Sequence, residues 1–416
     1  MKRNILNGIV LIMNILILVS MTKSSHNKIE ENVTLNEDKN LLSFMLETEV
    51  NSGKYQETKS STWPSDDYVF NTELSKCEQG SRLSWDSTKK TVVMIGDGSD
   101  KCYIYFDKEN ILLSNYIKSQ YTGTQGENNL YYHDSTLTNG AGDNSYRYAG
   151  SSDTTNNFVC FGYDSTAGTC STDHLYRIIG VFDNQVKLIK YDYGTTTELG
   201  TDGDYDGSFT PNASSNSSYY KGSLASINTY YWNSGAGTGT NTWSESRLNT
   251  TNLNTNYLKN IGTEWSNKIA NHTWKVGGNT LENITEVTAP NVYKNEITSP
   301  ADTTTYDAKV GLMYVSDYGY AAAPSAWTKL LSYDSENGYN NSSVTSVNWM
   351  YMGLWEWTIS RYTGSSNVAF DVGYDGRVDG EAVYRGSYAV RPVFYLTSST
   401  TYVSGDGTMS KPFIIN

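Results

Sequence analysis

Short apolar and aromatic runs, separated by glycine-rich polar turns, make up the end of this chain. They read GLWEWTISR at residues 353–361, VAFDVG at 368–373 and VRPVFYL at 390–396. Runs of this length between turn-forming residues are typical of short strands rather than helices. We therefore expect a terminal β-meander, and the fold must contain a sheet with tight turns.

A hairpin is the clearest element upstream of the meander. Residues 175–182 and 186–191 are rich in Ile, Val and aromatic side chains, and they flank Asp183-Asn184. This dipeptide suits the short turn of a β-hairpin. Residues 309–315 also read as a strand.

Two short helices are predicted between these strands. Leu248, Leu253 and Tyr257 recur at a spacing close to the helical period, and residues 264–270 can form a second short helix. Hairpin, helices and terminal meander indicate the α+β class.

The order of three motifs in the meander resembles that of the formylglycine-generating enzyme family. The motifs are WEWT at 355–358, RGS at 385–387 and RP at 391–392. That family is a branch of the C-type lectin-like fold. The resemblance implies a C-type lectin-like (formylglycine-generating-enzyme-like) domain over residues 151–416. Because this fold carries an oxidase and many binding proteins, it does not fix the function.

A second resemblance concerns membership rather than activity. Residues 173–182, residues 311–321 and the VRPVFYL ending are similar to uncharacterised secreted proteins of low-GC gut bacteria. This likeness extends over most of residues 63–416.

The cysteine positions argue against the oxidase chemistry of the resembled family. That chemistry depends on a pair of cysteines that binds copper late in the domain, beside the RGGS region. The last cysteine here is Cys170, and RGGS is shortened to RGS. A thiolate-bound metal requires its ligands, so the formylglycine-generating activity is not expected and no cofactor is required.

The N-terminal residues predict export. Residues 1–22 begin with Lys2 and Arg3 and continue as an apolar stretch, typical of a signal peptide. No clear cleavage site follows, so an uncleaved membrane anchor remains an alternative. We expect a secreted or extracellular protein that contacts a membrane only through this segment.

Four further segments are expected after residue 22. Residues 23–62 are polar and predict a flexible tether. Residues 63–107 read as a small β module, 108–150 as a connector, and 151–416 as the large domain.

Four cysteines are interpretable once export is expected. In an oxidising compartment an even number favours disulfides, and the local pairing joins Cys77 to Cys102 and Cys160 to Cys170. The first bridge would staple the small β module. A metal site is the alternative, but the chain has no CxxC pair and its four histidines are scattered.

Aromatic rings in polar loops are candidates for ligand binding, because Tyr and Trp dominate such surfaces. The alternative is that long loops pack their own rings on the sheet. Turns of the meander are the expected centre of the surface. The candidate side chains are Arg361, Tyr374, Asp375, Arg377, Tyr230, Tyr231, Trp232, Tyr318, Tyr320 and Trp327.

A calcium loop is suggested by DGDYDG at residues 202–207. Asp202, Asp204 and Asp206 have the spacing of the first half of such a loop. The twelfth position is Ala213 rather than a bidentate Glu. Calcium binding by this segment is therefore one interpretation, and a solvated acidic turn is the simpler one.

Structural roles are expected for the meander motifs themselves. Trp355 and Trp357 share one face of a strand and are more typical of a core. Glu356 points the other way and would accept hydrogen bonds or pair with Arg385 or Arg391.

Charge and composition narrow the function further. The net charge is −13, so binding of nucleic acid through its phosphates is not expected. No GxSxG motif or singled-out carboxylate pair points to a catalytic class. We expect a secreted or surface-attached binding protein with a glycan or protein ligand. The alternatives are an enzyme of unrecognised chemistry on the same fold and a structural, pilus-like component.

Overall fold

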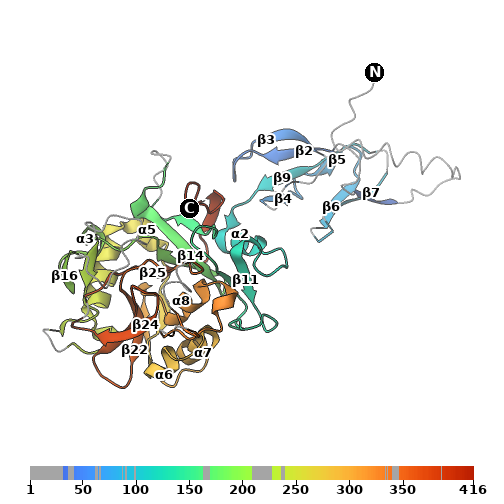
Figure 1. Cartoon of the computed structure of the whole chain (residues 1–416). Coiled ribbons are helices and arrows are strands. Elements are labelled where there is room, and N and C mark those ends of the chain that lie inside the picture. The colour runs from blue at the N-terminus through green and yellow to red at the C-terminus, as the bar shows by residue number, and fades with distance from the viewer. Residues whose placement is uncertain are drawn as a thin grey trace. The chain divides into compact units, whose positions relative to one another are not determined.

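The computed structural model describes residues 31–35, 42–60, 64, 67–86, 88–89, 91–97, 100–162, 169–208, 227–235, 239–332, 334, 336–339, 346–385 and 387–416. Its chain divides into two compact units, Met1–Ile111 and Leu112–Asn416. The described part is mixed α and β, with many short strands and few, short helices (Figure 1). The predicted signal or anchor, residues 1–22, lies outside the described residues.

The first unit consists of short strands in three small sheets. Their orders are β3-β2-β9-β4, β1-β7-β6 and β5-β8. The strands are β1 (Glu31–Leu35), β2 (Leu42–Glu47), β3 (Tyr55–Ser60), β4 (Tyr68–Phe70), β5 (Lys76–Cys77), β6 (Arg82–Asp86), β7 (Thr91–Gly96), β8 (Cys102–Tyr103) and β9 (Tyr105–Lys108).

The tether predicted at residues 23–62 is wrong for the residues described there. The polar segment contains β1, β2 and β3, and β2 pairs with β9 of the expected β module. Phe44 and Leu46, two positions apart on β2, join the hydrophobic cluster of this unit. Because one face of a short strand contributes only a few apolar residues, a strand such as β2 does not stand out in a segment of polar composition.

The two disulfides of the structure are Cys77–Cys102 and Cys160–Cys170. This is the local pairing expected from the sequence. Cys77 and Cys102 are opposite each other on β5 and β8, within the small unit.

The main sheet of the second unit runs β26-β27-β13-β14-β15-β25-β21, with β12 and β11 attached beside β14. Its strands are β11 (Leu130–His133), β12 (Ser145–Tyr148), β13 (Phe158–Cys160), β14 (Leu175–Phe182), β15 (Gln185–Lys190), β21 (Val310–Gly311), β25 (Val393–Tyr395), β26 (Thr401–Ser404) and β27 (Phe413–Ile415). β10 (Ile111–Leu112) lies where the two units meet in sequence.

Two sequence predictions about this sheet have opposite outcomes. The β14–β15 hairpin is confirmed, and Asp183 and Asn184 adopt the positive φ angles that its turn requires. The connector at 108–150 is wrong, because β11 and β12 extend the main sheet. The same segment also contains a short helix, α2 (Leu113–Ser119).

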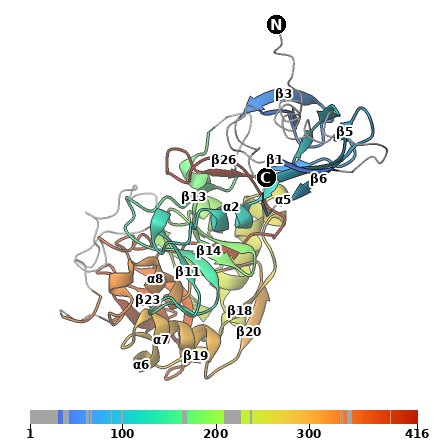
Figure 2. The same ribbon diagram turned by 90° about the vertical axis from the view of Figure 1, so that its right-hand side faces the viewer.

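The terminal meander is divided between two sheets. A second sheet has the order β19-β22-β23-β24, with β19 (Gly278–Asn279), β22 (Glu356–Tyr362), β23 (Val368–Val372) and β24 (Val378–Ala382). The run at 390–396 forms β25 of the main sheet instead. One small ribbon pairs β16 (Tyr205–Ser208) with β17 (Asn228–Tyr230). Another pairs β18 (His272–Lys275) with β20 (Thr305–Ala308) (Figure 2).

Short helices fill the connections between the strands. The predicted helix at 248–257 is a π-helix, η6 (Leu248–Tyr257), which matches the five-residue step from Leu248 to Leu253. The others are η1 (Glu127–Asn129), η2 (Thr172–His174), α3 (Thr196–Leu199), η5 (Trp243–Glu245), α4 (Leu258–Asn260), α5 (Thr263–Asn267), α6 (Leu281–Ile284), α7 (Ala289–Tyr293), η7 (Lys294–Thr298), α8 (Val315–Ala321) and η8 (Pro324–Ala326).

The strand predicted at 309–315 is only partly correct. β21 stops at Gly311, and α8 begins at Val315. Every residue of α8 is buried, so its sequence lacks the polar face that marks an amphipathic helix. α8 packs against α7 and β22 (Figure 1).

Candidate functional site

A cavity of about 510 Å³ opens beside the first residues of β14, between η2, α3 and α5. Its walls combine aromatic rings with hydroxyl, amide and carboxyl groups. This volume lies within the range of small-molecule sites, which commonly combine an apolar wall with a few fixed polar groups.

Aromatic rings form one wall of the cavity. Trp265 on α5 is partly exposed, and its ring meets that of Phe161 edge-on at 4.9 Å between centroids. Phe161 and Tyr176 are buried behind it, with centroids 5.4 Å apart. Trp265 is therefore a partly exposed ring supported by rings of the core.

Polar groups from α3 and its neighbours form another wall, and their orientation is fixed. The carboxylate of Glu198 accepts a hydrogen bond from the Thr195 N–H at 3.1 Å. It also forms an ion pair with Lys190 at 3.0 Å. Asn228 accepts from the Thr196 N–H at 2.9 Å, and the Asn260 amide donates to the backbone of Glu198.

The Cys160–Cys170 disulfide lies next to a third part of the cavity wall. It links the end of β13 to the segment that leads into η2, and residues after each cysteine line the cavity. Phe161 directly follows Cys160, and its N–H donates to the carbonyl of His174 at 2.9 Å. A side chain at Gly162 would clash, because its Cβ would lie 2.6 Å from the His174 ring. The bridge and this close contact hold the wall in place.

Five aromatic residues predicted to bind ligand are core residues instead. Tyr230, Trp232, Tyr318, Tyr320 and Trp327 are each at most 1% exposed, so their rings cannot present a face to a ligand in this structure. Tyr230 lies on β17, and Tyr318 and Tyr320 lie on α8, so these three rings belong to regular elements rather than to loops. The hydroxyl of Tyr231, a sixth candidate, donates to Asp206 at 2.5 Å.

The three aspartates of the calcium pattern do not converge on one point. Asp202 accepts from Asn256 at 2.5 Å, and Asp206 accepts from Tyr231. Asp204 is buried and accepts from Ser234. Within the part of the chain that the structure describes, no group of three or more His, Cys, Asp or Glu side chains could hold a metal ion.

The predicted binding turn of the meander is closed by its own hydrogen bonds. The Gly373 N–H donates to the Arg377 carbonyl at 2.7 Å, and the Tyr318 hydroxyl donates to the carbonyl of Gly376. The Arg377 guanidinium lies 3.1 Å from Asp379 and 3.8 Å from Asp375.

Two other candidates of the meander are also held in place. Tyr374 is partly exposed, and its carbonyl accepts from the Tyr351 hydroxyl. Arg361 is occupied by an ion pair with Asp302 and a hydrogen bond to the Val276 carbonyl.

Asp371 is an unexpected neighbour of this turn. It lies opposite Asp379 on β24 and Trp357 on β22. It is fully buried, and among the described residues neither of its carboxyl oxygens has a hydrogen-bond partner. Burial raises the pKa of Asp371 well above its usual range, and Asp379 and Glu381 raise it further.

The WEWT and RP motifs meet in the core. Both oxygens of Glu356 accept from the guanidinium of Arg391, each at 2.8 Å, and both side chains are buried. Arg391 is one of the two arginines that the sequence offers as partners of Glu356. The other, Arg385, is exposed. Trp357 is buried, whereas Trp355 is partly exposed and stacks on Tyr388 at 5.3 Å.

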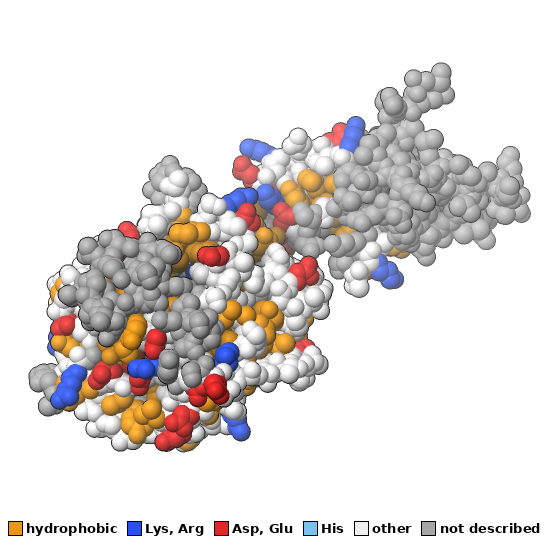
Figure 3. All heavy atoms as spheres, in the orientation of Figure 1, with side chains coloured by type: hydrophobic (Ala, Val, Ile, Leu, Met, Phe, Trp, Pro, Cys, Tyr) orange, Lys and Arg blue, Asp and Glu red, His pale blue; other side chains and the backbone are white. Residues whose placement is uncertain are grey.

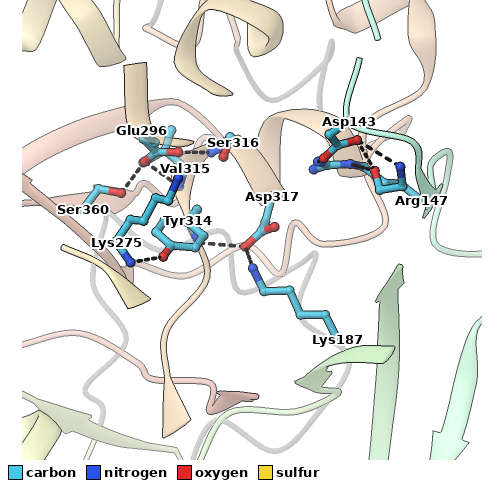
Figure 4. A network of polar contacts seen from close by, with 11 residues as sticks. Asp143, Arg147, Lys187, Lys275, Glu296, Tyr314, Val315, Ser316, Asp317 and Ser360 are labelled. Atoms are coloured by element: carbon cyan, nitrogen blue, oxygen red, sulfur yellow. Dashed lines mark hydrogen bonds and ion pairs between the residues drawn. The ribbon is translucent and has the colours of Figure 1, made fainter. Parts of the chain in front are cut away.

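A network of buried charges lies around α8 (Figure 4). Glu296 accepts from the N–H groups of Val315 and Ser316 and from the Ser360 hydroxyl. Burial raises the pKa of Glu296. Asp317 on α8 contacts Lys187 of β15 at 2.5 Å.

Arg147 forms the other part of this network. Its guanidinium pairs with Asp143 at 2.5 Å and lies over the rings of Phe182, Tyr293 and Tyr320. The core of this unit therefore contains buried cations surrounded by aromatic rings.

Sequence reasoning did not find the residues of the cavity. The helix predicted at residues 264–270 includes Trp265 but implies no role for it, and Glu198 lies outside every motif described above. One local signal was available, since Thr195 and Glu198 form a capping box that fixes the carboxylate. Their proximity to Trp265 depends on folding, so no spacing in the sequence shows it.

Comparisons with known proteins found no match to any family model, curated protein or solved structure. Among the residues described, no helix has the length and apolar character needed to span a membrane.

Proposed function

We propose that this chain is a secreted or surface-attached protein that binds a sugar unit of a glycan in the cavity beside α3 and α5. The observation that carries the proposal is the pairing of a partly exposed Trp265 with the fixed polar groups of Glu198, Asn228 and Asn260. A sugar ring offers an apolar face for stacking and hydroxyls for hydrogen bonding, and the two walls match these needs.

Further support for the proposal comes from the chain as a whole. The two disulfides suit an oxidising, extracellular setting, and the apolar residues 1–22 suit export. Charged side chains on the described face in Figure 3 are of both signs and scattered, which suits an uncharged ligand better than a polyanion. The proposal includes the C-type lectin-like fold implied by the meander motifs.

Binding is favoured over catalysis by the positions of the buried acids. Burial raises the pKa of Glu296, Glu356 and Asp371, but none of the three lines the cavity. We therefore advance the binding function and no specific reaction.

A glycan array, probed with and without calcium, tests the proposal, followed by calorimetry with the best ligand. Trp265→Ala should weaken binding at least about tenfold, as truncation of a central aromatic contact does. Tyr231→Ala is the matched control, because Tyr231 is a partly buried ring that does not line the cavity. A correctly folded protein that leaves the array blank would overturn the proposal.

A further inference from the structure

Lys187 and Asp317 make a contact in the interior of the second unit (Figure 4). The side-chain nitrogen Nζ of Lys187 on β15 lies 2.5 Å from the carboxyl oxygen Oδ2 of Asp317 on α8. The two side chains are 1% and 3% exposed, and 130 positions separate them in the chain.

Aromatic rings surround this contact. The Lys187 Nζ lies 4.7 Å from the ring centroid of Tyr314, 5.3 Å from that of Tyr395, and 5.7 Å from those of Trp274 and Phe182. Such a wall excludes bulk water, so the polar pair sits in a medium of low dielectric constant.

Burial acts against the ammonium form of Lys187, whereas Asp317 and the surrounding ring faces act for it. An ammonium group carries three N–H donors, and Asp317 Oδ2 is the hydrogen-bond acceptor present for Nζ in the described structure. Burial lowers the pKa of the Lys187 amine, although Asp317 acts in the opposite direction. A desolvated lysine in an apolar site is an activated nucleophile.

The carboxyl group is held for attack by its local backbone. The Tyr314 N–H donates to Asp317 Oδ2 at 2.9 Å, which places a donor where negative charge would develop on that oxygen. Glu296 anchors the same turn through the N–H groups of Val315 and Ser316. Asp317 Oδ2 is therefore fixed by two donors, Lys187 Nζ and the Tyr314 N–H, and the amine and the carboxyl group are held side by side.

We propose that Lys187 and Asp317 join in an isopeptide (amide) bond, formed by loss of water within the folded chain. Proton transfer across the contact gives an amine and a carboxylic acid. The nitrogen lone pair attacks Cγ and forms the N–C bond, while one C–O bond breaks. The leaving hydroxyl takes the proton that the nitrogen releases and departs as water. No oxidant or reductant enters the balance, and two buried charges disappear.

The bond would tie α8 covalently to the central strand β15. It would close a long loop and so restrict the unfolded chain, as a disulfide does. A cross-link of this kind does not depend on the redox state of the surroundings, which distinguishes it from the two disulfides.

Mass spectrometry of the purified full chain tests the proposal, once N-terminal sequencing has defined its first residue. The intact mass should fall below the sequence mass by about 18 Da, the mass of one water, after allowance for both disulfides. Proteolysis should yield one branched peptide that joins Lys187 to Asp317.

Two variants complete the design. Lys187→Arg should have its full sequence mass, because a guanidinium does not form this bond. Lys190→Arg is the matched control and should keep the deficit, since Lys190 is also buried and paired with a carboxylate, Glu198. Wild-type protein that is folded by circular dichroism but has its full mass would overturn the proposal. A branched peptide between other residues would also overturn it.

Discussion

Asp371 places a carboxyl group in the interior of the second sheet with no hydrogen-bond partner in the described structure. Its raised pKa means that the folded chain holds a proton that the unfolded chain loses near pH 4. The folded state binds more protons in this range, so the group's contribution to the free energy of unfolding falls as the pH rises above about 4.

Replacing Asp371 by Asn should remove this pH dependence. We expect the variant to exceed the wild type in unfolding free energy by about 1–3 kcal/mol at pH 8, with the difference shrinking toward pH 4. Urea denaturation at several pH values measures it. Asp153→Asn, at an exposed position, is the control. Parallel pH profiles for wild type and Asp371→Asn would contradict the expectation.

The contacts of a single residue could be predicted from the sequence where its chemistry allows few kinds of partner. Glu356 was expected to pair with an arginine, and it forms a two-bond contact with Arg391. Rings such as Tyr320 and Trp327 were misassigned because their polar neighbours suggested exposed loops. Burial depends on which connection folds over which sheet, and neighbouring residues do not encode that.

Among the elements, the β14–β15 hairpin could be predicted because local propensity and turn chemistry agree. α8 could not, because a fully buried helix shows no amphipathic period. The cavity combines β14 residues with α3 and α5, which lie far apart in sequence. Its walls are therefore a property of the fold rather than of a motif.

The Cys77–Cys102 bridge belongs to a unit with little core, whose hydrophobic cluster has only five buried residues among those described. Replacing both cysteines with Ser should destabilise this unit by about 3 kcal/mol, the loss expected for a loop of this size. Hydrogen exchange should accelerate in β2, β7 and β9.

The second unit supplies the comparison for this prediction. Exchange in β14 and β15 should stay unchanged, because these strands belong to a separate and larger cluster. Equal acceleration in both units would show that the bridge does not act locally.

Over the whole molecule, the sequence indicated a small β part before a large α+β part, but not where they divide. Polar residues before position 63 and the supposed connector at 108–150 both belong to sheets. The extent of each unit is set by pairing between strands that are far apart in the sequence, such as β2 and β9. Composition along the chain cannot register such pairs.

The unit Leu112–Asn416 contains all lining residues of the cavity and its own hydrophobic cluster. A chain of residues 112–416 should therefore fold alone and bind the ligand of the full chain with a Kd within about threefold, less than 1 kcal/mol. Calorimetry measures the Kd, and circular dichroism confirms folding. The same fragment with Trp265→Ala is the control for binding at the cavity. A folded fragment that has lost binding would show that residues before 112 contribute to the site.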